Sequence, residues 1–108
     1  MTSPFVLEAD LALTADVDRR APGGAVTVAL CGHWEHEGAC RWPHHSALDD
    51  ADAVARLRTV AVASDTERDE VVRRVERELR SDRRWRVVAF GVRDVRDDEV
   101  ELARRLAG

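Results

Sequence analysis

Several amino acids are missing from this chain of 108 residues, which contains no lysine, isoleucine, asparagine, glutamine or tyrosine. The codons of lysine, isoleucine, asparagine and tyrosine are AT-rich, so a GC-rich genome accounts for most of this bias. All 17 basic residues are therefore arginine. The same bias explains the arginine excess, which is no evidence of phosphate chemistry.

Long apolar runs are also missing, since nothing approaches the roughly 20 residues that a membrane span requires. The first residues, MTSPFVLEADLAL, have no basic segment, and Glu8 and Asp10 interrupt what would be a signal core. We therefore expect a cytoplasmic protein that does not interact with a membrane. In that reducing compartment the two cysteines are more often thiols, ligands or redox groups than a lasting disulfide.

The chain has no segregated charge of one sign, because 21 acidic residues are interspersed with the 17 arginines. Eight arginines lie between residues 65 and 86, yet seven aspartates or glutamates lie among them, mostly at helical spacing. A nucleic-acid-binding domain usually shows a basic face or stripe. The sequence thus predicts no nucleic-acid partner.

Apolar and polar residues alternate over residues 5–17, where every odd position is apolar. This period of two predicts a strand with one solvated face. The sequence DRRAPGG at 18–24 predicts a turn, since proline and paired glycines favour turn conformations. A second alternating run begins at Ala25 and predicts a strand antiparallel to the first.

The segment that follows is expected to prolong this second strand. Residues 40–42 would return as a short third strand that Pro43 ends. Residues 46–55 are acidic and fit either a short helix or a loop, so they stay unassigned.

The second half of the chain has clearer patterns, with valine-rich strands predicted at 58–64 and 85–92. Between them, Ser64 and Glu67 have the spacing of a capping box, which predicts the start of a helix. The apolar stripe of this helix comprises Val71, Val72, Val75 and Leu79. Its expected ion pairs are Asp69 with Arg73, Glu70 with Arg74 and Glu76 with Arg80.

Three acidic residues at 97–99 open a predicted C-terminal helix. The succession of strand, helix and strand before it forms a crossover, which favours parallel neighbours. We therefore expect a single α+β domain over residues 1–108. Its mixed sheet would begin with antiparallel strands, contain one βαβ crossover near the C-terminus, and carry helices on one face.

The stretch CGHWEHEGACRWPHH at 31–45 holds both cysteines, all four histidines and two of the three tryptophans. Zinc is held by thiolate sulfur and imidazole nitrogen in a tetrahedron, so these residue types predict a zinc-type metal site or a ligand site. The spacing does not repeat the close pairs of familiar structural sites. The candidate ligands are Cys31, His33, Cys40 and His44, with His36 and His45 as substitutes.

The register of a hairpin decides which of these side chains would meet. A two-residue turn at Gly38-Ala39 would bring the first four candidates to one face. A turn one residue longer would instead pair Trp34 with Trp42. The sequence does not choose between the two registers.

Other hypotheses for the cluster remain open. The cysteines and tryptophans could simply pack, or Cys31 and Cys40 could form a disulfide or redox pair. Trp34, Trp42 and the histidines could form a homodimer or protein-partner surface without metal. A thiol-dependent or zinc-dependent enzyme is a further alternative, but HWEH is not the HExxH motif, and we assign no catalytic residue.

Overall fold

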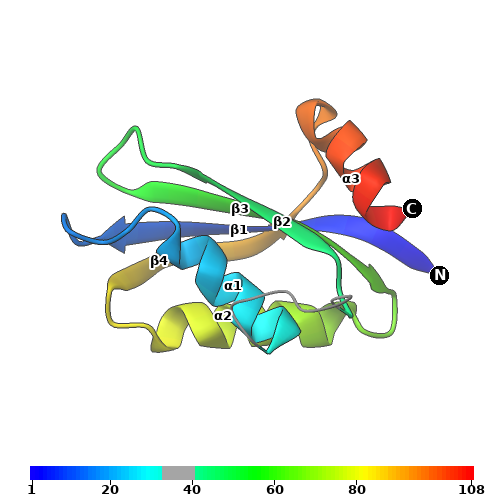
Figure 1. The fold of residues 1–108 in the computed structure, drawn as a ribbon, viewed down its shortest axis with the longest axis horizontal. Coiled ribbons are helices and arrows are strands. Elements are labelled where there is room, and N and C mark those ends of the chain that lie inside the picture. The colour runs from blue at the N-terminus through cyan, green and yellow to red at the C-terminus, as the bar shows by residue number, and fades with distance from the viewer. Residues whose placement is uncertain (33–40) are drawn as a thin grey trace.

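The computed structural model describes residues 1–32 and 41–108, which form four strands, three α-helices and one short 3-10 turn (Figure 1). In chain order the elements are β1 (Thr2–Leu13), α1 (Ala21–Cys31), β2 (His44–Asp49), β3 (Ala55–Ser64), α2 (Arg68–Ser81), β4 (Trp85–Arg93), η1 (Asp97–Glu99) and α3 (Val100–Ala107).

The four strands form one sheet in the order β2-β3-β1-β4, and every pair of neighbours is antiparallel. The predicted α+β class is therefore confirmed. Strands β1 and β2 are parallel to each other, and β3 lies between them. Strands β3 and β4 are likewise parallel, and β1 lies between them. These two interleaved βαβ units make the arrangement known as ferredoxin-like.

The predicted crossover is confirmed only in part. Helix α2 does connect two strands of the same direction, β3 and β4, but β1 pairs with both of them and separates them. The prediction of a mixed sheet is therefore wrong. Strand β1, from the start of the chain, lies between β3 and β4. No local pattern in residues 58–92 could predict this position.

The strand predicted from Ala25 is also wrong, because residues 21–31 form helix α1. Pro22 lies in the first turn, where its fixed φ and missing N–H suit a helix start. Gly32 ends the helix with φ of 82° and donates its N–H to the carbonyl oxygen of Val28. A short, largely apolar run of this kind does not distinguish a buried helix from a strand by periodicity.

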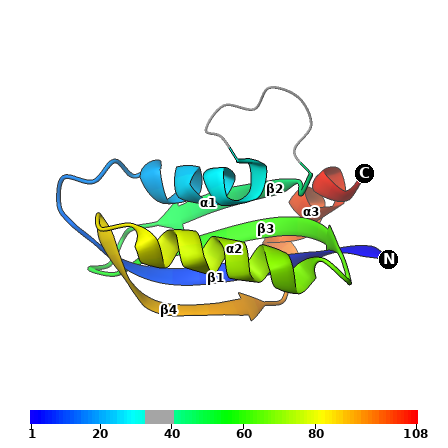
Figure 2. The same cartoon turned by 90° about the horizontal axis from the view of Figure 1, so that it is seen from below.

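The main core lies between the sheet and the pair of helices α1 and α2, which lie side by side on one face (Figure 2). Strand β1 contributes alternate residues from Phe5 to Leu11, as its period of two predicts. Three of the four predicted stripe residues of α2 are buried, namely Val71, Val75 and Leu79. Trp42 and Trp85 complete this core.

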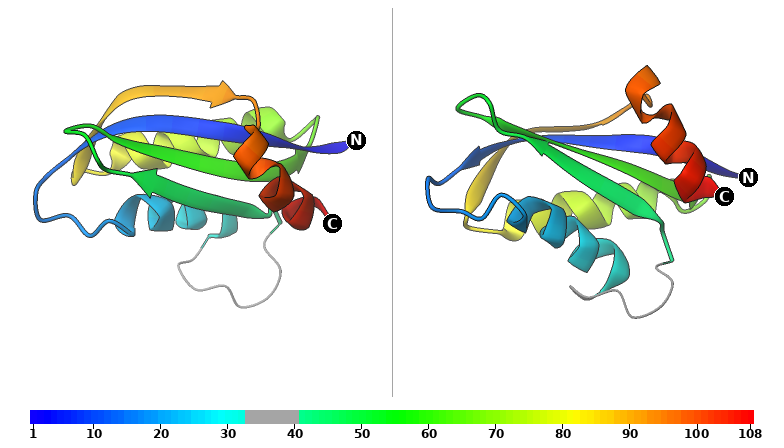
Figure 3. Two further views of the ribbon diagram at one scale, coloured as in Figure 1. Left: turned by 90° about the horizontal axis from the view of Figure 1, so that it is seen from above. Right: turned by 45° about the horizontal axis from the view of Figure 1, so that its top comes forward.

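Helix α3 covers part of the opposite face of the sheet (Figure 3). Its Ala103 packs with Val6 of β1 and Val60 of β3, and all three side chains are buried. The prediction that helices cover only one face is therefore wrong. Strand side chains alternate between the two faces, so Val6 and Val60 lie on the side away from α1 and α2. Helix α3 removes these apolar side chains from water.

The predicted third strand is not present at Arg41 and Trp42, and Cys40 lies outside the described residues. The next strand is instead β2, which begins at His44, directly after Pro43, and pairs with β3. Ser64 also differs from the expected capping box, because its hydroxyl donates to the carboxylate of Glu67, 3.1 Å away, and α2 begins at Arg68.

Candidate functional site

Half of the predicted metal ligands lie within the described residues. Cys31 is the last residue of α1, while His44 and His45 are the first two residues of β2. The other predicted residues of the cluster, namely His33, Trp34, His36, Cys40 and the Gly38-Ala39 turn, lie outside the described residues. The predicted strand through Cys31 is wrong, because this residue ends helix α1, while the predicted turn lies outside the described residues.

His44 and His45 point to opposite faces of the sheet. His44 is opposite Ala61, which belongs to the core under α1 and α2, while His45 is opposite Val60, which belongs to the cluster under α3. Cys31 packs against the first of these clusters. One metal ion could therefore contact Cys31 and His44 from the same side, but not His45 with them.

Two hydrogen bonds orient the imidazole of His44. Its Nδ1 lies 3.0 Å from the carbonyl oxygen of Trp42, and because a carbonyl only accepts, Nδ1 carries the hydrogen. Its Nε2 lies 3.2 Å from the Oγ1 of Thr27 in α1. In the neutral ring Nε2 therefore holds the lone pair, on the side that faces α1.

The Thr27 hydroxyl has a second acceptor, the carbonyl oxygen of Gly23, also at 3.2 Å. A hydroxyl has one proton, so it donates to Nε2 or to this carbonyl, but not fully to both. These residues line a small hollow of about 220 Å³ together with Ser46 and with His45, whose side chain lies on the other face of the sheet because strand residues alternate. The His44 lone pair therefore faces the Thr27 hydroxyl, which can donate to the Gly23 carbonyl oxygen instead.

Cys31 takes part in a disulfide bond, so in this state its sulfur is not a thiolate. Over residues 1–32 and 41–108, no three histidine, cysteine or acidic side chains are grouped so that they could hold a metal ion. A metal site at His44 would therefore need at least one ligand from residues 33–40.

Trp42 is 2% exposed and packs in the main core. The guanidinium groups of Arg41 and Arg74 lie over its ring, 4.7 and 4.9 Å from the centroid. The partner-surface hypothesis expects Trp42 to be available for contact, whereas burial leaves its ring inaccessible in the folded monomer. That hypothesis would rest on Trp34 and the histidines alone.

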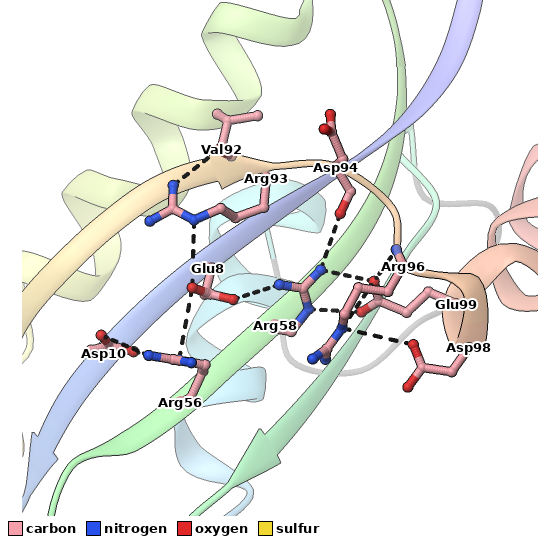
Figure 4. Close-up of polar contacts among 10 residues, drawn as sticks. All are labelled: Glu8, Asp10, Arg56, Arg58, Val92, Arg93, Asp94, Arg96, Asp98 and Glu99. Carbon is pink, nitrogen blue, oxygen red and sulfur yellow. Dashed lines mark hydrogen bonds and ion pairs between the residues drawn. The ribbon is translucent and has the colours of Figure 1, made fainter.

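A network of charged side chains lies on the other face of the sheet, and its central residue is the only charged residue among the described ones that is buried (Figure 4). Its centre is Arg58 of β3, whose side chain is 9% exposed. The Arg58 guanidinium donates two hydrogen bonds to the Glu99 carboxylate at 2.8 and 2.9 Å, one to Glu8, and one to the carbonyl oxygen of Asp94 at 3.2 Å. Arg58 thereby ties η1 and the start of α3 to the sheet.

Register in the sheet assembles the rest of this network. Glu8 lies directly opposite Arg58, and Asp10 lies directly opposite Arg56. Arg56 donates to Asp10 at 2.9 Å, and Arg93 of β4 approaches Glu8 at 3.5 Å. None of these residues is among the site residues predicted from the sequence. Two acidic residues in β1 and two arginines in β3 have the same spacing of two, which would have predicted the ion pairs. That prediction was possible only if the pairing of β1 with β3 was already known.

The charges of this network are mutually satisfied. Hydrogen bonds from Arg58 lower the pKa of Glu99 from 4.5 to about 2, and Glu99 in turn raises the pKa of Arg58. A catalytic carboxylate needs a pKa near the working pH and access to substrate. Glu99 has neither property, so the network is better suited to holding α3 than to chemistry.

No protein-family model matches the chain, and no curated protein or solved structure matches it either. The ferredoxin-like arrangement supports many unrelated functions, so it does not indicate one here. In the described part of the chain, no helix is long and apolar enough to cross a membrane.

The lowered pKa of Glu99 predicts acid sensitivity. A carboxylate whose pKa is lower in the folded state stabilises the fold above its unfolded pKa, and this contribution is lost as the pH falls. We therefore expect the free energy of unfolding to decrease between about pH 4.5 and pH 2, by up to about 3 kcal/mol from this group. Urea unfolding at several pH values measures the step. Glu99→Gln should be less stable at neutral pH and should not show this loss of stability at low pH. If the variant shows the same pH dependence as the wild type, Glu99 is not the group responsible.

Proposed function

We propose that the domain binds a transition-metal ion of the zinc type through His44 and the reduced form of Cys31. The remaining ligands would come from His33, His36 and Cys40, as the residue types of the cluster predict. His45 is left out of the ligand set because its side chain lies on the opposite face of the sheet.

The orientation of His44 is the observation that carries this proposal. A metal-binding histidine almost always donates its other ring N–H to a carboxylate or a backbone carbonyl, which fixes the tautomer and raises the basicity of the ligating nitrogen. The bond from Nδ1 to the Trp42 carbonyl has this form and leaves Nε2 as the ligand atom. Thr27 would turn its hydroxyl to Gly23 when a metal ion takes its place at Nε2.

The redox state of Cys31 would control loading. The thiolate is the form of cysteine that binds metal, so the disulfide that includes Cys31 must first be reduced, with two electrons from an added thiol or phosphine. Metal binding and the disulfide are therefore mutually exclusive. We expect the oxidised protein to bind no zinc at this site.

Elemental analysis and equilibrium dialysis of the full chain without a His tag test the proposal. Reduced wild-type protein should bind about one zinc ion per chain, and the oxidised protein none. His44→Ala and Cys31→Ser should each weaken zinc binding by at least about tenfold. His45→Ala is the matched control, since it removes a neighbouring imidazole on the other face, and its zinc affinity should be unchanged. A reduced, folded chain that ignores added zinc would overturn the proposal, as would equal losses in His44→Ala and His45→Ala.

A further inference from the structure

A groove lies between α1 and α2 and is lined by residues of both helices. It consists of two hollows of about 450 and 570 Å³ that share Val28 of α1 and Glu78 of α2. The hollows exist because the α1 wall is built from small residues, namely Ala21, Gly24, Ala25, Val28 and Ala29. Each has a volume in the range of small-molecule sites.

The larger hollow carries an excess of positive charge on its α2 wall. Three arginines line it against two glutamates, which gives a net charge of +1. One of the three, Arg74, is already bound to Glu70 at 3.3 Å and lies over the ring of Trp42. The remaining net charge of +1 comes from the other two arginines together with Glu78.

These two are Arg73 and Arg77, which lie one helical turn apart. Within the described residues neither forms an ion pair, and the predicted pair of Asp69 with Arg73 is not formed. Their guanidinium groups line the larger hollow beside the exposed apolar side chain of Val28. Among the described residues, the larger hollow thus combines two arginines that form no ion pair with the small apolar residues Val28 and Ala29, and it contains one glutamate, Glu78.

We propose that this groove binds a small organic oxyanion with a short apolar tail. Its head, a carboxylate or a phosphate monoester, is held by Arg73 and Arg77, because a guanidinium matches the geometry of two oxyanion oxygens. Its tail lies on Val28 and Ala29. Glu78 repels the head from the junction with the smaller hollow, so the head lies at the Arg73 end. This site is independent of the metal site proposed above.

An NMR titration of the full ¹⁵N-labelled chain tests the site with hexanoate and butyl phosphate as probes, and with hexylammonium chloride as the opposite charge. We expect saturable shifts of the backbone amides at 28–29 and 73–77 for at least one oxyanion, with Kd on the order of millimolar for so open a site. Hexylammonium should cause no such shifts. If only hexanoate binds, the site prefers a carboxylate; if only butyl phosphate binds, it prefers a phosphate monoester.

The variant Arg73→Ala, Arg77→Ala should weaken oxyanion binding by at least about tenfold, because it removes two charge-assisted partners. The matched control is Arg83→Ala, Arg105→Ala, which removes the same charge at exposed positions outside the groove and should bind as the wild type does. Circular dichroism confirms that both variants fold. Equal binding by both double variants, shifts spread over all exposed arginines, or no saturation by either oxyanion would overturn the proposal.

Discussion

Arg58→Ala is expected to lower the free energy of unfolding by about 3 to 5 kcal/mol, because it removes one partner of a buried ion pair. The Glu8 and Glu99 side chains are only 13% and 12% exposed, so the variant leaves two carboxylates out of water without their cation. It also removes the hydrogen bond to the carbonyl oxygen of Asp94, in the segment that connects β4 to η1. Urea unfolding at neutral pH, followed by circular dichroism, measures the loss.

Arg56→Ala provides the control for this prediction. Arg56 pairs with Asp10 on the same face, but its side chain is 54% exposed, and solvent screening leaves ion pairs of that kind with little effect on stability. A triple variant, Glu8→Leu, Arg58→Met, Glu99→Leu, should recover most of the stability lost in Arg58→Ala, since apolar residues of similar volume often replace a buried ion network without cost. Equal effects of Arg58→Ala and Arg56→Ala would show that the network is no more stabilising than a surface pair.

Trp42→Ala is expected to cost about 3 to 5 kcal/mol, the usual range for deleting a large buried aromatic side chain. The Trp42 ring is buried between the helices and the sheet, and two arginines lie over it. The carbonyl oxygen of Pro43, the next residue, accepts the N–H of Val62 at 2.9 Å. Trp42 therefore anchors the chain where it enters β2.

Val88→Ala is the comparison for Trp42→Ala, because Val88 lies on β4 with 52% exposure and should change stability by less than about 0.5 kcal/mol. Urea unfolding reports both variants. Sedimentation then separates two explanations of an unexpected result. A Trp42→Ala variant that keeps wild-type stability but loses a dimer present in the wild type would place the ring at an interface, as the partner-surface hypothesis requires.

Local patterns predicted the elements that have one clear periodicity. The alternation in residues 5–17 indicated β1, although that strand ends at Leu13, and the stripe from Val71 to Leu79 indicated α2. The alternating run from Ala25 predicted a strand, and residues 18–24 a turn, because valines at every second position fit a strand as well as a fully packed helix. Pro22 and Gly32 were the better signals, since they suit the start and the end of a helix.

The candidate sites were less predictable than the fold class. Cys31 and His44 could be proposed from residue type, but the opposite directions of His44 and His45 follow from the pairing of β2 with β3. Glu8, Arg58 and Glu99 are 50 and 41 residues apart along the chain, so no local spacing connects them. The groove at Arg73 and Arg77 depends on how α1 lies against α2.

The sequence by itself determined the α+β class, the strongest strands and helix, and the residue types gathered at 31–45, because periodicity and composition are local properties. Only the tertiary structure decided that β1 separates β3 from β4, that α3 covers the second face, and that Arg58 is buried between two glutamates. Strand order and register bring together residues that are distant in sequence. The free energy that selects them comes from burying Val6, Val60 and Trp42 in the assembled fold, and it has no counterpart in any single segment.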